Sequence, residues 1–374
     1  MRILIAPDKF KGSLGAREVG ENIAAGLRES LPGAAIDIQP VADGGEGTAE
    51  IICEALGGEW VQCPAHDELG RLINAHYVYI EERKLALIEM AEAAGMGRGP
   101  ENMRDPLRAN TFGVGEMILQ AARKGAVEIV VGLGGSATND GGFGMARALG
   151  YRFFAEDEHG QQLRRAVAKL AKLDRIEKPG NLSLPKIVGA ADVRNPLLGK
   201  NGATRVFGPQ KGVSPRDIEA LERALSRFAD EITREFGCDY REEAGAGAAG
   251  GLGFGLRSFC DATLCSGFEL FSEMIGLEAR VKAADVIVTG EGRLDAQTLE
   301  GKAAGGMGRL GKKFGKPVFA IVGDLQDHPG MGELFDRVHV LARAPVTAEE
   351  AMQQTAELLR LRARELGALL KRSK

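Results

Sequence analysis

The sequence predicts a two-domain α/β protein whose parallel strands are covered by helices on both faces. Along most of the 374 residues, short apolar runs rich in Ile and Val alternate with longer amphipathic stretches. Most of the short runs are apolar throughout, as is typical of parallel strands buried on both faces. The chain is also longer than one hydrophobic core usually supports, and this favours two domains.

Eight apolar runs are predicted as strands because each is short, rich in β-branched residues and bounded by polar or glycine residues. They are Arg2–Ala6, Ala35–Gln39, Leu85–Met90, Glu128–Gly132, Lys186–Ala190, Asp285–Thr289, Pro317–Val322 and Arg337–Leu341.

The first predicted helix places Val19, Ile23 and Leu27 on one face. Gly15 precedes it, and glycine is an acceptable N-cap residue. Glu18 stands three residues later, where its side chain can return to the N-cap backbone. We therefore expect the helix to begin directly after Gly15.

A longer helix is predicted where apolar residues step by three and four from Ile218 to Ile232. Ser214 is its expected N-cap, with Pro215 at the first position and Asp217 in the first turn. Gly237 follows the last turn, where a left-handed residue commonly ends a helix.

The last predicted helix begins with a capping box formed by Thr347 and Glu350. Its apolar face continues to Leu370, so we expect one helix up to the carboxyl terminus.

Two stretches interrupt the alternation. Residues 66–90 are typical of strands joined by turns, and residues 151–213 are irregular and contain scattered prolines. We therefore predict a discontinuous Rossmann-like α/β domain with a parallel sheet, formed by residues 1–62, 111–150 and 275–374. Residues 63–110 and 151–274 are predicted to form an inserted α/β domain.

Composition argues against several classes of function. A net charge of −4 without a basic stripe disfavours binding to nucleic acid. No apolar run approaches the roughly 20 residues needed to span a membrane. The five cysteines form no CxxC pair, the five histidines are scattered, and the amino-terminal apolar run is too short for a secretory signal. We expect a cytoplasmic protein with free thiols and no zinc; its oligomeric state stays open.

Polar, glycine-rich loops follow five of the predicted strands. In open parallel sheets, ligands bind outside the carboxyl ends of the strands, where such loops converge. The sequence therefore predicts a binding site there. The five loops read PDKFKGSL, ADGGEGT, GLGGSATNDGG, ADVRNPL and GEGRLDAQT.

The loop GLGGSATNDGG is suited to an anion. Gly134, Gly135 and Ser136 can direct several backbone N–H groups toward one point, and the helix expected over Phe143–Leu149 aims its positive end the same way. Asp140 would then hold a divalent cation beside a phosphate. The alternative is a glycine-rich turn followed by a helix cap.

The loop ADGGEGT carries two carboxylates, Asp43 and Glu46, beside two glycines. Mg²⁺ usually takes one or two carboxylates together with phosphate oxygens. Asp43 is alternatively the group that accepts a proton from an attacking hydroxyl. A third interpretation is an exposed acidic turn before a helix over Thr48–Leu56.

Several cations lie in or near the same loops. Lys9 and Lys11 follow the first strand, where their compact charges suit phosphate or carboxylate, although such lysines are usually only solvated. Arg293 and Lys211 are candidates for binding the carboxylate of a hydroxy acid.

Familiar nucleotide and hydrolase motifs are missing. The sequence has no GxxxxGK[ST] and no GxSxG. The run Gly245–Gly250 matches GxGxxG, but REEA precedes it where a Rossmann motif requires an apolar strand. An oxidoreductase that uses this run remains an alternative function.

The strings APDKFKGSL, PVADGGEGT, IEMAEAAGM, GLGGSATNDGGFGMARALG, NPLLGKNGATRVFGPQKG, GAGAAGGLGFG and VTGEGRLDAQTLEGK run nearly from end to end. In content and order they resemble the bacterial glycerate kinase family of glyoxylate and galactarate metabolism. The resemblance implies a two-domain α/β fold without a P-loop and the use of ATP with Mg²⁺. It also implies phosphorylation of D-glycerate, at the 2-hydroxyl. The alternatives are a glycerate 3-kinase and a sensor that binds a nucleotide or hydroxy acid without turnover.

The resemblance also marks positions that line the site. Asp192 or Asp43 is expected to accept the proton of the glycerate hydroxyl, and Lys11 to neutralise charge on the transferring group. Asp43, Glu46 and Asp140 are the metal candidates. Arg194 replaces a residue that is often Thr in the family, so it adds a positive charge near Asp192. The expected substrate- and phosphate-binding residues are Asp8, Gly44, Gly45, Gly134, Gly135, Ser136, Thr138, Asn139, Asn195, Gln210, Lys211, Glu291, Arg293 and Asp295.

Overall fold

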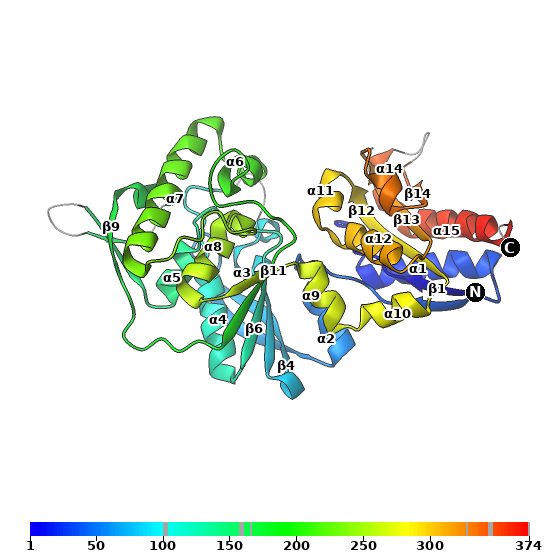
Figure 1. Ribbon diagram of the computed structural model, residues 1–374, viewed down its shortest axis with the longest axis horizontal. Coiled ribbons are helices and arrows are strands. Elements are labelled where there is room, and N and C mark those ends of the chain that lie inside the picture. Colours follow the sequence, from blue (N-terminus) through cyan, green and yellow to red (C-terminus); the bar gives the residue numbers. More distant parts are fainter. Residues whose placement is uncertain (100–103, 157–160, 165–166, 327, 343–346, 373–374) are drawn as a thin grey trace. The chain divides into compact units, whose positions relative to one another are not determined.

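The computed structural model describes all residues except 100–103, 157–160, 165–166, 327, 343–346 and 373–374 (Figure 1). The chain forms two compact units. Met1–Asp43 and Phe268–Lys374 make the terminal unit, and Gly44–Gly267 makes the central unit. None of the helices in the described part of the chain is long and apolar enough to cross a membrane.

The terminal unit contains a sheet of five parallel strands in the order β14-β13-β12-β1-β2. Both faces of the sheet are buried, as the uninterrupted apolar runs predict. The strands are β1 (Arg2–Ile5), β2 (Ala35–Ile38), β12 (Val286–Leu294), β13 (Val318–Leu325) and β14 (Arg337–Val340).

Helices cover the two faces of this sheet. Ile3 and Ile5 of β1 pack with α1 (Ala16–Ser30) and α15 (Thr355–Arg372), whereas Leu4 packs with α10 (Leu277–Ala283) and α12 (Ala303–Lys313). Gly26 allows α1 and α15 to meet closely, because a Cβ at this position would lie 2.1 Å from the Arg360 carbonyl oxygen. The remaining helices of this unit are short: α9 (Gly267–Met274, which begins at the boundary), α11 (Ala296–Glu300), α13 (Met331–Leu334) and α14 (Ala348–Gln353).

The central unit contains a six-stranded mixed sheet in the order β11-β10-β6-β5-β4-β3. Strands β5, β6, β10 and β11 are parallel, and β3 and β4 join them as an antiparallel pair. A second, antiparallel sheet has the order β8-β7-β9. The strands are β3 (Glu59–His66), β4 (Leu72–Ile80), β5 (Leu85–Glu89), β6 (Glu128–Gly132), β7 (Arg152–Ala155), β8 (Gln162–Leu163), β9 (Leu173–Glu177), β10 (Lys186–Ala190) and β11 (Thr263–Cys265).

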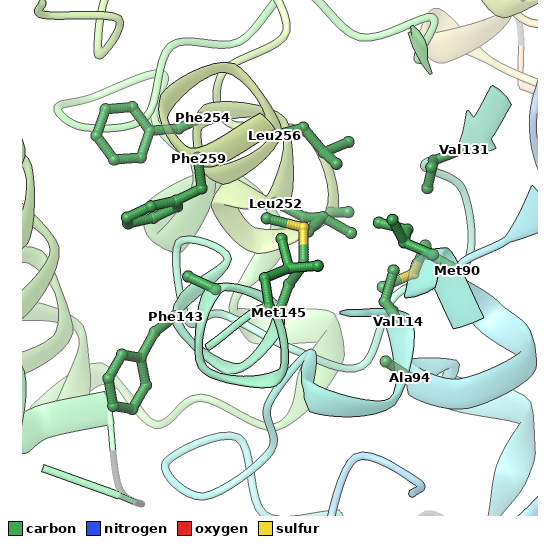
Figure 2. Packing of buried hydrophobic residues seen from close by; sticks show 14 of the residues in the cluster. Met90, Ala94, Val114, Val131, Phe143, Met145, Leu252, Phe254, Leu256 and Phe259 are labelled. Atoms are coloured by element: carbon green, nitrogen blue, oxygen red, sulfur yellow. The ribbon is translucent and has the colours of Figure 1, made fainter. Parts of the chain in front are cut away.

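One large apolar core fills the central unit. Figure 2 shows part of it, where Phe143 and Met145 belong to the same cluster as Leu252, Phe254 and Phe259. Aromatic rings dominate this core, and Phe143, Phe153 and Phe228 contact one another at tilted or edge-on angles. The helices of this unit are α2 (Thr48–Leu56), α3 (Ala91–Ala94), α4 (Phe112–Lys124), α5 (Phe143–Ala148), α6 (Ala203–Phe207), α7 (Pro215–Phe236) and α8 (Ala248–Cys260), with a short 3₁₀ turn, η5, at Pro209–Lys211.

The two α/β units confirm the predicted fold class, and all eight predicted strands are present. The main difference is the length of β12, which continues through Gly290 to Leu294 because Arg293 and Leu294 pair with Asp324 and Leu325 of β13. Part of the loop predicted at GEGRLDAQT is therefore a strand.

The predicted helix ends are largely confirmed. The Gly15 N–H donates to Glu18 Oε2 at 3.0 Å, and Gly237 ends α7 with φ +74°. Ser214 does precede α7, but its hydroxyl hydrogen-bonds to the Asp217 carboxylate at 2.6 Å instead of accepting from the backbone.

At the carboxyl terminus, Thr347 and Glu350 form the predicted capping box. The helix predicted as continuous is divided, however, into α14 and α15 on either side of Gln354.

The compact units divide the chain differently from the predicted domains. Residues 44–62 and 111–150 belong to the central unit, where β6 lies between β5 and β10 and β3 pairs with β4. An apolar run indicates a strand but does not indicate which sheet it joins, so the sequence pattern placed β6 with the terminal strands.

Candidate active site

Four parallel strands of the central unit end together. Glu89, Gly132, Ala190 and Cys265 are the last residues of β5, β6, β10 and β11, and they lie side by side in the sheet register. The loops that follow these strands carry most of the residues predicted for the site. We call this row of strand ends and loops the central edge.

Glycines allow two loops of the central edge to touch. A Cβ on Gly134 would lie 2.5 Å from the Gly45 Cα, and the Gly134 N–H donates to the Gly44 carbonyl oxygen at 3.1 Å. Gly44 has φ +90° and would also place a Cβ 2.8 Å from the Ala190 carbonyl oxygen. Side chains here would force the loops apart, so these glycines are needed for backbone packing.

The segment Gly134–Ser136 retains backbone donors. Gly135 has φ +75° and is exposed. Within the described part of the chain, no hydrogen bond uses the N–H of Gly135 or Ser136. Successive N–H groups around a left-handed glycine form the concave arrangement that binds anions. We call Gly134–Ser136 the glycine nest.

Lys211 lies beside this nest but is buried, with 2% of its surface exposed. Its ammonium donates to Ser136 Oγ and to the Thr138 carbonyl oxygen, both at 2.7 Å. Burial lowers the pKa of Lys211 to about 7, although the negative charge of Asp140 acts in the opposite direction. The neighbouring Gln210 is exposed.

Asp140, a predicted metal ligand, is fully buried. Its carboxylate accepts hydrogen bonds from the N–H groups of Thr111, Gly142 and Gly144 at 2.9–3.1 Å, and from the Thr111 hydroxyl. Burial raises the pKa of Asp140, and the bonds from Thr111 and Gly144 partly offset this. Asp140 thus links the beginnings of α4 and α5 through hydrogen bonds, and its role as a metal ligand stays a prediction.

Asp192 follows β10 and is partly buried. Its carboxylate accepts a hydrogen bond from the Ser266 hydroxyl at 2.7 Å. Ser266 lies just after β11, so the sheet register brings together two residues that are 74 positions apart. The sequence analysis missed Ser266, because a single Ser after a short strand carries no distinct signal.

The other polar residues of the central edge mainly support its loops. Asn139 is fully buried and donates to the Thr204 hydroxyl at 3.0 Å, while Asn195 donates to the Asn201 carbonyl oxygen at 2.8 Å. Glu89, also missed, is a buried carboxylate that accepts from the Ala49 N–H at 2.7 Å near the start of α2. Its signal was a charge at the end of an apolar strand.

The GxGxxG run proves to be a packing element. A Cβ on Gly250 would lie 1.9 Å from the Thr138 carbonyl oxygen, and one on Gly247 would lie 2.2 Å from the Pro196 carbonyl oxygen. Residues 249–251 have left-handed backbone angles at the start of α8. These glycines contact protein backbone instead of presenting a loop to a dinucleotide, which removes the motif on which the oxidoreductase alternative rested.

The terminal unit carries a different set of groups at the carboxyl ends of β1, β2 and β12, which we call the terminal edge. Burial raises the pKa of Asp8 well above its ordinary value, and the charges of Asp43 and Glu291 raise it further. Burial also raises the pKa of Glu291 to about 7, although Thr298 donates its hydroxyl to Glu291 at 2.6 Å and opposes this shift. Three carboxyl groups therefore lie within electrostatic reach of one another.

The remaining predicted residues of the terminal unit are more exposed. Lys11 is exposed, and Arg293 lies 3.6 Å from the Asp324 carboxylate on the neighbouring strand. Asp295 is 3.4 Å from the Lys302 ammonium. Thr298 and Lys302 lie within the string VTGEGRLDAQTLEGK, but the sequence analysis gave them no role, because the pattern does not show that they face Glu291 and Asp295.

Whether these residues suit Mg²⁺ depends on how many ligands the protein must supply. Among the residues that the structure describes, no group of three or more His, Cys, Asp or Glu is arranged to hold a metal ion alone. Mg²⁺ needs only one or two carboxylates when phosphate oxygens and water complete its shell. Asp8 and Asp43 fit that requirement, because a cation would relieve the repulsion that raises the pKa of Asp8. Glu46 is exposed in the central unit.

Comparison with known proteins identifies the family of this chain. A family model described as the glycerate kinase family matches residues 3–371. The chain belongs to the glycerate kinase family. The protein is therefore a kinase, and the resemblance predicted from its motifs is confirmed.

Relatives match nearly the whole chain. A glycerate kinase of Halalkalibacterium halodurans is 41% identical over 98% of this chain and 97% of its own length. A glycerate 2-kinase of Escherichia coli is 40% identical over 99% of this chain and 98% of its own length. A crystal structure from Salmonella typhimurium, assigned as glycerate kinase 2, is 42% identical, covers 100% of this chain and 99% of that chain, and has a TM-score of 0.83.

Proposed function

We propose that this protein transfers the γ-phosphoryl group of ATP to the 2-hydroxyl of D-glycerate. The glycine nest carries the proposal, since it offers unused N–H donors at the strand ends of a glycerate kinase family member. The name of the Escherichia coli relative, glycerate 2-kinase, favours the 2-phosphate product. A cytoplasmic location remains a prediction from the sequence.

The nest is the proposed phosphate site. Backbone N–H groups of Gly135 and Ser136 would donate to ATP phosphate oxygens, and the contacts of Gly44 and Gly45 with Gly134 keep side chains out of the way. Such preformed donors need no rearrangement when charge develops in the transition state, which is how they lower its energy.

Asp192 is the proposed proton acceptor. The Ser266 hydroxyl donates a hydrogen bond to it, so its carboxylate is oriented before substrate binds. Asp43, the alternative, interacts electrostatically with Asp8 and Glu291, and we assign this group of carboxyl side chains to the cation instead. Phosphoryl transfer asks mainly for positioning and charge stabilisation, and one oriented base meets the remaining need.

Asp8 and Asp43 are the proposed ligands of Mg²⁺. The ion would neutralise phosphate charge. Lys11, which is exposed at the terminal edge, is proposed to add a compact positive charge for the transferring group.

The direct test is turnover. Purified protein would be incubated with ATP, Mg²⁺ and D-glycerate, while ADP release is followed and the product is identified by ³¹P NMR. We expect ADP together with a phosphomonoester whose proton coupling marks attachment at C2. Coupling to a CH₂ group would instead assign a 3-kinase. No ADP release, with glycerate still raising the melting temperature, would favour the sensor that binds without turnover.

A further inference from the structure

We propose that Lys211 is a positioning residue that keeps the glycine nest in shape through Ser136 and Thr138, and is not itself a cation that contacts ATP. This inference rests on the proposed function of the nest. It differs from the expectation drawn from the sequence, in which Lys211 binds the substrate directly.

The backbone of Lys211 is held in place by its own turn. Lys211 belongs to η5, where its N–H donates to the Gly208 carbonyl oxygen at 2.9 Å. Gly212 follows with φ +93° and closes the turn. The long side chain therefore extends from a short, well-bonded segment toward the loop after β6.

Hydrogen bonds hold the loop after β6 on two sides, and Lys211 supplies those of the second side. On one side, the Met96 N–H donates to the Gly135 carbonyl oxygen and the Ala137 N–H donates to the Ala94 carbonyl oxygen, both near 2.9 Å. The Lys211 ammonium bonds to the two residues that flank Ala137, namely Ser136 and Thr138. The nest is thus held between Ala94 and Met96 on one side and η5 on the other.

Burial argues against direct contact with a ligand. Only 2% of Lys211 is exposed, and Thr138 is fully buried. Two short hydrogen bonds already use the ammonium, and Asp140, whose negative charge acts on it, is also buried. Lys11, by contrast, is exposed.

Lys211→Met removes both hydrogen bonds while keeping an unbranched apolar stem. Without the ammonium, Ser136 Oγ and the Thr138 oxygen lose their partner and the loop opens more often. We expect hydrogen exchange at the Ala137 amide to become roughly tenfold or more faster in the protein without nucleotide. The matched control is Lys200→Met, at an exposed lysine of the same unit, which should leave this exchange unchanged.

A double-mutant cycle in the active protein tests whether Lys211 affects ATP binding through Ser136. Lys211→Met should raise KM for ATP roughly tenfold more than it lowers kcat, because it disorders a binding loop. Ser136→Ala should produce a smaller effect of the same kind, and the double variant should resemble Lys211→Met alone. If Lys211→Met does not fold, Ser136→Ala still tests the proposal by its own faster exchange at Ala137.

Two results would overturn the proposal. One is unchanged exchange at Ala137 in Lys211→Met together with weak ATP binding, because that combination indicates direct contact. The other is additive effects of the two substitutions on KM. Since exchange is measured without substrate, an inactive wild-type protein would count against the proposed function and leave this inference standing.

Discussion

The central and terminal edges use opposite chemistry at similar places in their sheets. The central edge presents backbone N–H groups in a glycine nest and one oriented carboxylate, Asp192. The terminal edge gathers three carboxyl groups, of which Asp8 and Glu291 have raised pKa values. The central edge therefore offers hydrogen-bond donors that suit an anion, whereas the terminal edge offers acidic groups that suit a cation.

The buried charges show how each edge is stabilised. At the central edge, Asp140 is buried among four donor groups that bond to its carboxylate, and it stabilises backbone. At the terminal edge, Glu291 has one hydroxyl donor, and burial shifts its pKa to about 7. A carboxylate with many internal partners is structural, whereas carboxylates that repel one another are suited to a cation.

The largest expected effect is on catalysis by Asp192. Asp192→Asn keeps the size of the side chain but removes the proton acceptor, so we expect kcat to fall roughly 10²–10⁴-fold. The melting temperature should change little. Asp261→Asn serves as the matched control, because Asp261 is 97% exposed and has a left-handed backbone that Asn tolerates. Near-normal kcat in Asp192→Asn, with a large loss in Asp43→Asn, would transfer the role to the terminal edge.

The next effect tests whether close backbone packing builds the central edge. Gly250→Ala combines φ +67° with a Cβ that would lie 1.9 Å from the Thr138 carbonyl oxygen. We expect it to destabilise the central unit by more than about 3 kcal/mol. Gly199→Ala, at φ +86° with open space around it, should cost only about 1 kcal/mol. Equal losses in thermal or urea unfolding would show that the contact with Thr138 is not tight.

Asp140→Asn separates a structural carboxylate from a metal ligand. The amide group would face N–H donors of Thr111, Gly142 or Gly144. We therefore expect a loss of about 2–3 kcal/mol in stability. Added Mg²⁺ should leave this loss unchanged, whereas a wild-type melting temperature that rises with Mg²⁺ and a variant that does not respond would restore the metal role.

The smallest expected effect is that of Glu291→Gln on the pH dependence of stability. It tests the raised pKa of Glu291 at the terminal edge. Folded Glu291 has a pKa of about 7, above its ordinary 4.5, so between these pH values the folded chain binds more protons than the unfolded chain. Wild-type stability should fall as pH rises through this window, by about 2 kcal/mol relative to Glu291→Gln. Thermal unfolding at pH 4.5 and 7.5 measures the difference. The exposed control Glu333→Gln should show no such trend, and a flat difference for Glu291→Gln would contradict the raised pKa.

Local patterns made much of the fold predictable. Apolar runs located the strands, and Gly15 with Glu18, Gly237, and Thr347 with Glu350 marked helix ends, because caps depend on residues close in sequence. Sheet membership depends on distant pairing, so the prediction grouped β6 with the wrong neighbours relative to the compact units.

The sequence was enough to locate the loops of the proposed site, but it did not show which contacts each residue makes. The order of glycines and polar residues after β6 was enough to locate the nest. Asp140 meets Thr111, 29 residues away, and Lys211 meets Ser136, 75 residues away. Only the folded chain shows that these partners bury both charges, and that Asp140 and Lys211 support the loop from within.

The response of the nest amides to nucleotide is the most direct test of whether the glycine nest binds phosphate. Protein labelled with ¹⁵N at glycine and serine would be titrated with ATP and Mg²⁺, and the Gly135 and Ser136 amide resonances would be followed. We predict downfield proton shifts at both amides, saturating together, because each N–H gains a phosphate acceptor. Saturating shifts elsewhere in the chain, with these two amides unchanged, would contradict the glycine nest as the phosphate site.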